Sequence, residues 1–122
     1  MDMAAESLKG TGASTARSIA PDELKALIQS GAELTILDLR RRNAFDADTV
    51  TVPGATWYDP ERMADWSESL PRDAEIVLYC VHGETISNAA VDHLHAMGRR
   101  ARLIIGGFDA WKACGGMLAY KP

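Results

Sequence analysis

Residues 75–98 read EIVLYCVHGETISNAAVDHLHAMG, and this stretch decides the fold. After Glu75 the chain is apolar through Cys80, which is typical of a strand covered on both faces of a sheet. A short polar loop with one glycine follows. Four apolar residues then recur at helical spacing: Ile86, Ala90, Leu94 and Met97. Gly98 follows them where a helix commonly ends, so the stretch predicts a buried strand, a tight loop and a helix.

Two further apolar runs, LTILDL (34–39) and ARLII (101–105), predict strands on either side of this unit. A strand, a helix and a strand in succession form a βαβ unit and therefore a parallel sheet. Shorter signals predict a helix from Pro21 to Gly31, a short strand at 55–57 and a short helix at 59–66. The fold class is therefore α/β. In such sheets ligands bind beyond the carboxyl ends of the strands, which is where Cys80 falls.

The chain has 122 residues and a net charge of −4, which predicts one domain without a basic field for nucleic acid. Residues 1–17 are small, polar and aperiodic, so we expect a flexible tail followed by a domain at 18–122. The sequence shows no apolar run long enough for a membrane span and no export signal at its start. We therefore expect a cytoplasmic protein whose two cysteines, Cys80 and Cys114, are free thiols.

The loop after Cys80 has the form of an anion-binding nest. Five residues turn around the thiol before the helix: Val81, His82, Gly83, Glu84 and Thr85. Their N–H groups, together with the positive end of the following helix, favour a thiolate at Cys80. The alternative is that Cys80 is only a small core residue, as most free cysteines are. The combination of strand, glycine-containing loop and helix favours a nucleophile.

Four motifs together resemble the rhodanese (sulfurtransferase) family. They are LDLR (37–40), VPGA (52–55), VLYCVHGETIS (77–87) and LIIGGFDAW (103–111). The resemblance implies a central parallel sheet of about five strands, flanked on both faces by helices, with Cys80 carrying a persulfide. It also implies supporting roles for Asp38, Arg40 and Ser87 near the site. Arg40 has two open roles, facing the Cys80 pocket or pairing with a carboxylate that holds its own loop.

Differences from related patterns limit the chemistry. Phosphatases and arsenate reductases of similar form use C-x5-R, and here Ile86 stands at the arginine position. The cationic loop residue of many thiosulfate-using members is also absent, and Glu84 places an acid in the loop instead. This acid opposes an anionic donor. The sequence therefore favours sulfur transfer over phosphoryl transfer.

Other candidate residues have weaker signals. His82 is either a partial positive charge at the loop or an exposed histidine on its rim. Cys114 is either a resolving thiol or, as we favour, a structural residue. His93 and His95 point to different sides of one helix, so we expect them to be solvated and to share no metal. Sulfur transfer through a cysteine thiolate requires neither a metal nor an organic cofactor.

Together these features predict a sulfurtransferase that moves a sulfane sulfur from thiosulfate or a persulfide to a thiophilic acceptor through a Cys80 persulfide. Its partners would be a small sulfur donor and a thiol or cyanide acceptor, or a protein persulfide, without nucleic acid or membrane. The alternative is a catalytically idle rhodanese-like module in which the loop binds a protein partner or serves regulation.

Overall fold

The computed structural model describes residues 16–121, and a five-stranded sheet with all neighbouring strands parallel forms its centre. From one edge to the other the strands are β2 (Ser18–Ile19), β7 (Arg100–Ile104), β6 (Glu75–Tyr79), β3 (Thr35–Asp38) and β5 (Ala55–Trp57). The α-helices are α2 (Pro21–Gln29), α3 (Arg42–Ala47), α4 (Met63–Trp66), α5 (Thr85–Ala96) and α6 (Gly107–Ala113). This confirms the predicted fold class.

Apolar residues alternate between the two faces of the sheet, and each face has its own core. In β6, Ile76 and Leu78 pack on one face with Ala90, Val91 and Leu94 of α5. Val77 and Tyr79 point to the other face, where the cluster also contains Leu24 of α2 and Phe108 and Trp111 of α6. A strand that is covered on both faces needs an apolar residue at every position. The continuous run at 76–80 arises from this double burial.

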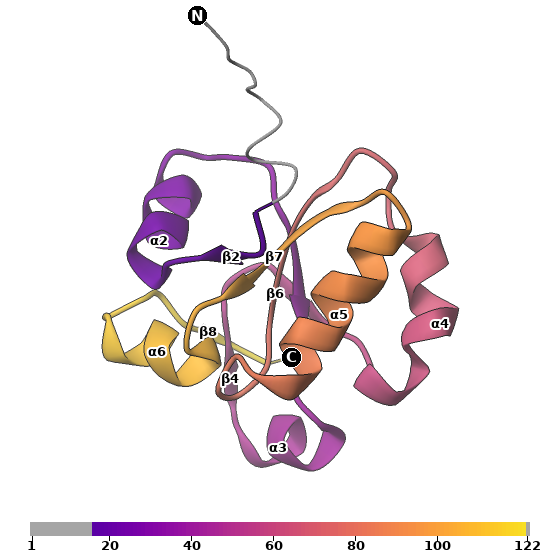
Figure 1. Ribbon diagram of the computed structural model, residues 1–122. Coiled ribbons are helices and arrows are strands. Elements are labelled where there is room, and N and C mark those ends of the chain that lie inside the picture. The colour runs from indigo at the N-terminus through magenta and orange to yellow at the C-terminus, as the bar shows by residue number, and fades with distance from the viewer. Residues whose placement is uncertain (1–15, 122) are drawn as a thin grey trace, which may run out of the picture.

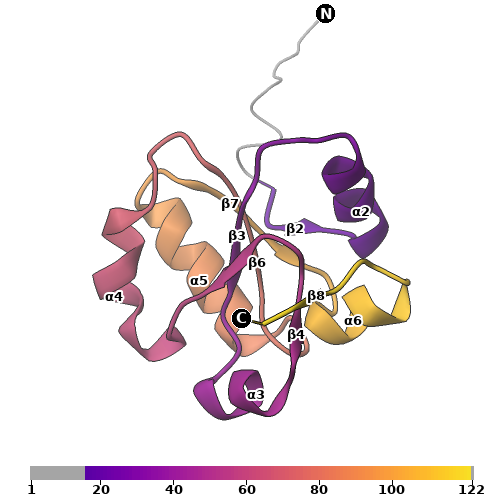
Figure 2. The same cartoon turned by 180° about the vertical axis from the view of Figure 1, so that it is seen from behind.

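Helices cover both faces of the sheet (Figure 1). The longest, α5, lies with α4 on one side of the sheet, and α2 lies with α6 on the other (Figure 2). Helix α5 ends as its sequence predicts, with Gly98 at a positive φ of 77° just after the last turn. Helix α3 lies beyond the carboxyl ends of the strands, near the start of α5, and so contributes to the same end of the molecule as Cys80.

Several elements differ from the sequence prediction. The segment expected to be one short helix at 59–66 is a 3₁₀ turn, η1 (Pro60–Arg62), followed by α4 and a second 3₁₀ turn, η2 (Ser67–Ser69). Helix α6, which starts at Gly107 directly after Gly106, is an element that the sequence analysis does not predict. Two short strands, β4 (Val50–Thr51) and β8 (Ala119–Tyr120), form a separate antiparallel pair that the sequence does not predict.

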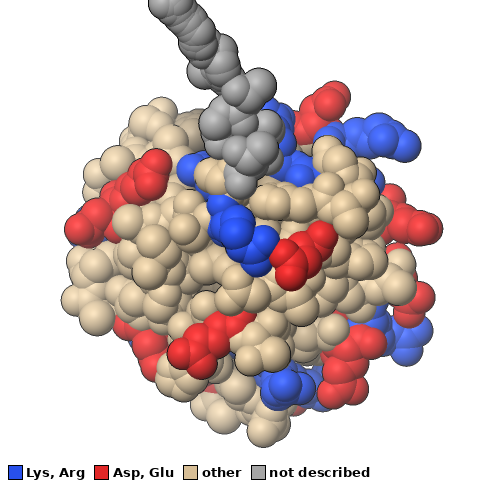
Figure 3. All heavy atoms as spheres, viewed as in Figure 1, with Lys and Arg blue, Asp and Glu red and all other residues tan. Residues whose placement is uncertain are grey.

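The predicted domain begins close to the first strand of the structure, and residues 1–15 of the expected tail lie outside the described residues. Arg17, expected at the end of that tail, accepts a backbone hydrogen bond from Leu103 and pairs with Asp92 at 2.6 Å. Among residues 16–121, no helix is long and apolar enough to cross a membrane. The face seen in Figure 3 carries both basic and acidic side chains, and neither sign covers it alone.

Candidate active site

Cys80 follows directly on β6 and is only 6% exposed. The alternation of the strand carries on past its last residue, so Cys80 points to the same face as Ile76 and Leu78, the face that α5 covers. Hydrogen bonding extends the sheet here as well, because the N–H of Leu39 donates to the carbonyl of Tyr79 at 2.7 Å. The thiol therefore lies at the carboxyl end of a central strand, beside the start of α5.

The loop that follows Cys80 is held by the first turn of α6. The carbonyls of Cys80 and Val81 accept hydrogen bonds from the N–H groups of Phe108 and Asp109, at 2.8 and 3.1 Å. In a trans peptide the N–H points opposite to the carbonyl, so the N–H groups of Val81 and His82 point away from α6. Val81 and His82 both belong to the lining of the Cys80 pocket. Helix α6 thus sets the orientation of the amides that the sequence predicts to surround the sulfur.

Two glycines allow this close contact between the loop and α6. Gly83 has a φ of +72°, and a β-carbon there would lie 2.8 Å from the nitrogen of Gly107. Gly107 has a φ of +66°, and a β-carbon there would lie 2.6 Å from the carbonyl oxygens of both Cys80 and Val81. These neighbours are backbone atoms that cannot turn aside, so both positions require glycine on two grounds. The loop and the helix touch backbone to backbone.

Ser87 makes the direct side-chain contact with the thiol. Its hydroxyl donates a hydrogen bond to the sulfur of Cys80 at 3.1 Å, and the serine is fully buried. Because α5 begins at Thr85, the sulfur also lies near the positive end of a twelve-residue helix. A hydroxyl donor and a helix N-terminus both stabilise negative charge on the sulfur. Ser87, predicted to support the site, thus contacts the Cys80 thiol directly.

A cavity of about 330 Å³ opens over Cys80, between α3 and the start of α5. Its lining includes all of the predicted loop residues except Gly83. The lining residues are Arg41, Asn43, Ala44, Cys80, Val81, His82, Glu84, Thr85 and Ile86. Cys80 is the only buried residue among them, so it forms the floor of the pocket. The cavity can therefore bring a small sulfur compound to the thiol.

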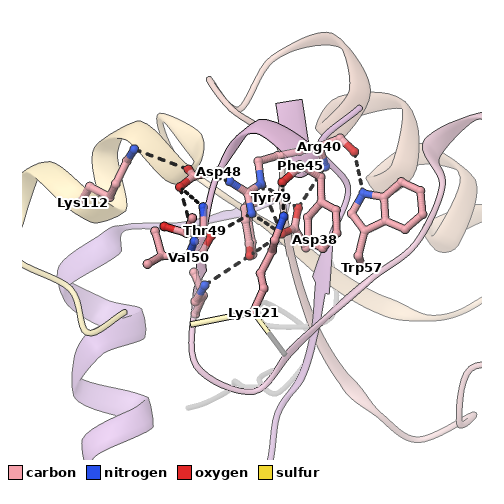
Figure 4. A network of polar contacts seen from close by, with 11 residues as sticks. Asp38, Arg40, Phe45, Asp48, Thr49, Val50, Trp57, Tyr79, Lys112 and Lys121 are labelled. Carbon is pink, nitrogen blue, oxygen red and sulfur yellow. Dashed lines mark hydrogen bonds and ion pairs between the residues drawn. The ribbon is translucent and has the colours of Figure 1, made fainter. Parts of the chain in front are cut away.

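Arg40 does not line this pocket. It is 2% exposed and lies on the opposite face of the sheet, with its guanidinium 2.7 Å from Asp38 and 3.0 Å from Asp48 (Figure 4). It also lies over the ring of Phe108 at 4.5 Å from the ring centre and donates to the carbonyl of Val50. Of the two roles left open by the sequence, Arg40 has the structural one.

Asp38 and Tyr79 complete this buried network. Asp38 accepts from the Tyr79 hydroxyl at 2.9 Å, and that hydroxyl in turn accepts from the N–H of Val52. Burial, and then the charge of Asp38, raise the pKa of Tyr79 well above its ordinary value. Burial alone would lower the pKa of Arg40, but its hydrogen bond and ion pair with Asp38 raise it overall. The network ties β3 to β6 and to the loop before β4, close to the active-site end but behind it.

Asp48 carries the outer end of the network. Burial would raise the pKa of its carboxyl group, but hydrogen bonds from the N–H groups of Val50 and Thr49 lower it. The charges of Arg40 and Lys112 act in the same direction, so the pKa of Asp48 lies below its ordinary value. The chain from β3 through α3 to β4 is therefore held by a carboxylate that is stable as an anion.

Arg41 is the pocket cation that the sequence analysis does not identify. Alternation along β3 and its continuation places Ile36, Asp38 and Arg40 on one face and Leu37, Leu39 and therefore Arg41 on the other. The face of Leu37 and Leu39 is the face of Cys80. The sequence shows the alternation along β3, but the register that pairs Asp38 with Tyr79, and so brings Arg41 and Cys80 to the same face, comes from the structure.

The remaining candidates lie at or outside the rim. His82 is exposed and pairs through Nδ1 with Asp109 at 3.0 Å, which places it on the rim with a partner. Cys114 donates to the carbonyl of Trp111 and packs against the α2 and α6 core, so it is not part of the pocket lining. His93 and His95 are not free in solvent, because each is half-buried and hydrogen-bonded: His93 to Ser67 and His95 to the carbonyl of Ala101.

A larger depression of about 830 Å³ lies at the opposite, amino-terminal end of the sheet, between the turns before β3 and β6. Its charged residues have both signs and include Glu33, Arg72, Glu75 and Arg102. Its lining contains no cysteine or histidine. The smaller cavity over Cys80 is therefore the candidate active site, because it holds a buried thiol that accepts a hydrogen bond from Ser87.

Fold and sequence motifs together define a class of protein. Residues 20–114 match the family model described as a rhodanese-like domain. The match spans most of the chain, so the protein belongs to the rhodanese-like family, as the four motifs predict.

Among the similar curated proteins is thiosulfate sulfurtransferase GlpE of Pseudomonas entomophila, 30% identical over 97 residues that cover 80% of this chain and 85% of that protein. The protein of the same name from Pseudomonas aeruginosa is 26% identical over 99 residues, which cover 81% and 86%. A rhodanese-like domain protein from Staphylococcus aureus has a TM-score of 0.73 at 26% identity, covering 87% of this chain and 99% of its own. A rhodanese-related protein from Thermoplasma volcanium has a TM-score of 0.75 at 24% identity, covering 86% and 99%.

Proposed function

We propose that the protein is a sulfurtransferase that carries a sulfane sulfur on Cys80 as a persulfide. The observation that carries the proposal is the contact of 3.1 Å between the buried Ser87 hydroxyl and the Cys80 sulfur, at the floor of an open pocket. A buried cysteine that served only packing would need neither a polar donor nor a cavity above it. The similarity to proteins named thiosulfate sulfurtransferase supports the same reaction class.

The reaction has two half-reactions. In the first, the Cys80 thiolate attacks the sulfane sulfur of the donor, a new S–S bond forms, and the donor's own bond to that sulfur breaks. The leaving group is sulfite when the donor is thiosulfate, and a thiolate when the donor is a persulfide. In the second, cyanide or a thiol attacks the outer sulfur of Cys80 persulfide and restores the Cys80 thiolate. The N–H groups of Val81 and His82 and the Ser87 hydroxyl stabilise negative charge in both directions.

Phosphoryl transfer fits the pocket poorly. Ile86 occupies the position at which C-x5-R enzymes place their arginine, and Arg40 is engaged with Asp38 and Asp48 behind the site. A phosphate dianion would meet Glu84 at the mouth and Arg41 as the one permanent cation in the pocket lining. A persulfide carries at most one negative charge on its outer sulfur and needs less compensation.

A rhodanese-like binding module is the second candidate. Such a module would use the surface around the loop, where Ile105 is exposed at the end of β7, and would need no reactive thiol. Mass spectrometry of the intact protein after incubation with thiosulfate or a persulfide distinguishes the two. A sulfurtransferase gains one sulfur atom on Cys80, whereas Cys80→Ser gains none and keeps its fold.

Turnover provides the second arm of this test. Thiocyanate formation from a sulfane donor and cyanide should require Cys80 and proceed normally in Cys114→Ser, since Cys114 is not part of the pocket lining. Full turnover in Cys80→Ser, or an unreactive Cys80 in the native protein, would reject the proposed reaction. Persulfide chemistry with two free cysteines suits a reducing cytoplasm, where we place the protein.

A further inference from the structure

The two walls of the Cys80 pocket carry opposite charges. Arg41 belongs to the segment that leads into α3, and Glu84 is the last loop residue before α5. Both side chains are exposed, and Cys80 forms the floor of the cavity that they share. Within residues 16–121, neither Arg41 nor Glu84 is in an ion pair. Each charge is therefore available to a molecule that enters the pocket.

Arg41 differs in this respect from both of its neighbours in the run of three arginines. Arg40 is buried against Asp38, and Arg42 lies over the ring of Trp57 at 4.7 Å from its centre. Only Arg41 of the three lines the Cys80 cavity. Strand parity explains this, because alternate residues after β3 point to opposite faces of the sheet. The alternation along the chain thus places Arg41 at the pocket and Arg40 on the opposite face of the sheet.

The charges of Arg41 and Glu84 favour donors that carry both a negative and a positive group. A dianion such as thiosulfate gains from Arg41 but loses to Glu84, so the two effects largely cancel. A small zwitterion with one carboxylate and one ammonium group gains from both. Ala44, Val81 and Ile86 supply apolar surface in the lining, which suits a short carbon chain that leads to a sulfur atom. About 330 Å³ is ample for a molecule of amino-acid size.

We infer that the sulfur donor is a low-molecular-weight persulfide of an α-amino acid thiol, of which cysteine persulfide is the smallest. Its carboxylate binds Arg41, its ammonium group binds Glu84, and its outer sulfur reaches Cys80. Arg41 and Glu84 are then specificity-determining residues of the pocket. This inference rests on the proposed function and adds the donor class to it.

The transfer step balances without an oxidant. The Cys80 thiolate attacks the outer, protonated sulfur of R–S–SH, and a bond forms between the two sulfurs. The bond between the donor's sulfurs breaks, and its electron pair leaves on the inner sulfur as R–S⁻. The proton stays on the transferred sulfur, so Cys80 becomes a persulfide and the donor becomes an ordinary thiolate. The charge of the pocket is the same before and after the step.

Four donors that differ only in charged groups test the inference. They are the persulfides of cysteine (both groups), N-acetylcysteine (carboxylate only), cysteamine (ammonium only) and 2-mercaptoethanol (neither). The readout is the rate at which one sulfur atom appears on Cys80, by rapid quenching and intact mass, as a function of donor concentration. The native protein should use cysteine persulfide about five- to tenfold better, in kcat/KM, than either singly charged donor.

The variants separate the two contacts. In Arg41→Gln, cysteine and cysteamine persulfides should react alike, because the carboxylate has lost its partner. In Glu84→Gln, cysteine and N-acetylcysteine persulfides should react alike. Glu33→Gln and Arg72→Gln make the same chemical changes at exposed positions at the amino-terminal end of the sheet and should retain the native preference.

Equal use of all four donors by the native protein would overturn the inference while leaving the proposed function intact. A variant that slows all four donors by one factor would do the same, because it would indicate a general effect on Cys80. If no donor placed sulfur on Cys80, both the inference and the proposed function would fail.

Discussion

The hydroxyl of Ser87 lies 3.1 Å from the sulfur of Cys80 and donates to it, although the two residues belong to different elements. Cys80 directly follows the last residue of β6, and Ser87 lies in the first turn of α5. The loop between them must therefore bring the helix back over the sulfur within six residues. This contact links the end of β6, the loop and the start of α5 at the sulfur atom. Substitution of Ser87 tests its effect directly.

Ser87→Ala should slow alkylation of Cys80 by iodoacetamide, and sulfur uptake with it, by roughly ten- to a hundredfold, because a hydrogen bond to a charged group is worth about 1.5–3 kcal/mol. The substitution removes only the hydroxyl from a fully buried position, so the fold should persist. Ser30→Ala, at the end of α2, removes a hydroxyl that bonds a backbone carbonyl instead and is the matched control. Unchanged alkylation in Ser87→Ala would mean that the hydroxyl does not stabilise the thiolate.

Glu84→Gln should raise kcat/KM for thiosulfate about five- to tenfold, since Glu84 lines the pocket and its negative charge repels a dianion. The gain should shrink as added salt screens the charge. Steady-state thiocyanate formation at low and high ionic strength measures both effects, with Glu33→Gln as the control. A ratio of variant to native rates near one at every salt concentration would place Glu84 outside the path of the donor.

Asp48→Asn should destabilise the protein by about 1–3 kcal/mol at neutral pH, because Arg40 then loses a partner for its buried charge. The pKa of Asp48 is lowered in the folded protein, so its stabilising effect is present above its unfolded-state value, near 4, and is lost as the pH falls through the folded-state value. The difference between native and variant should therefore be largest at neutral pH and decrease on acidification. Urea unfolding at pH 7 and at acid pH measures it. A difference that stayed constant across that range would rule out the ionised carboxylate as its cause.

Gly107→Ala should reduce both stability and activity. A β-carbon at this position would lie 2.6 Å from the carbonyl oxygens of Cys80 and Val81. The alanine would also have to adopt the left-handed backbone conformation, which residues with a side chain rarely adopt. Strain of these two kinds costs about 2–5 kcal/mol and should displace the loop amides from the sulfur. Gly31→Ala has the same backbone strain but meets no atom within 4 Å, so it isolates the contact from the conformation. Equal losses in the two variants would show that the contact with the loop does not matter.

The sequence predicts the central strands and α5 because their signals are local. Continuous apolar runs at β3 and β6 arise from burial on two faces, and the helical spacing of α5 needs no knowledge of the rest of the chain. Helix α6 has no such signal, because its start is Gly106 and Gly107, two residues of low helix propensity with positive φ. Its first N–H groups are satisfied by the carbonyls of the Cys80 loop, a contact that only the tertiary structure supplies.

The candidate site was predictable to a similar extent. Cys80, its loop and Ser87 were named from one contiguous stretch, and the structure places them together. Arg40 has its structural role, and Arg41 takes the place at the pocket, because one residue along an extended chain changes the face of the sheet. The helical character of residues 42–47 is also hidden in sequence, as no residue of α3 is buried to give it an apolar face. These are the parts of the site that depend on how separate segments meet.

The contact between Gly83 and Gly107 also limits how this protein could change its chemistry. The backbones of the two segments are in direct contact there, so the loop has no space for an additional residue. A wider ring of amides, as a tetrahedral oxyanion requires, could form only if α6 moved outward at the same time. That movement would break the two hydrogen bonds from Phe108 and Asp109 and disturb the packing of Trp111 beneath them. A single insertion would therefore damage the old site before it built a new one, and conversion to oxyanion chemistry would need coordinated changes in two segments more than twenty residues apart.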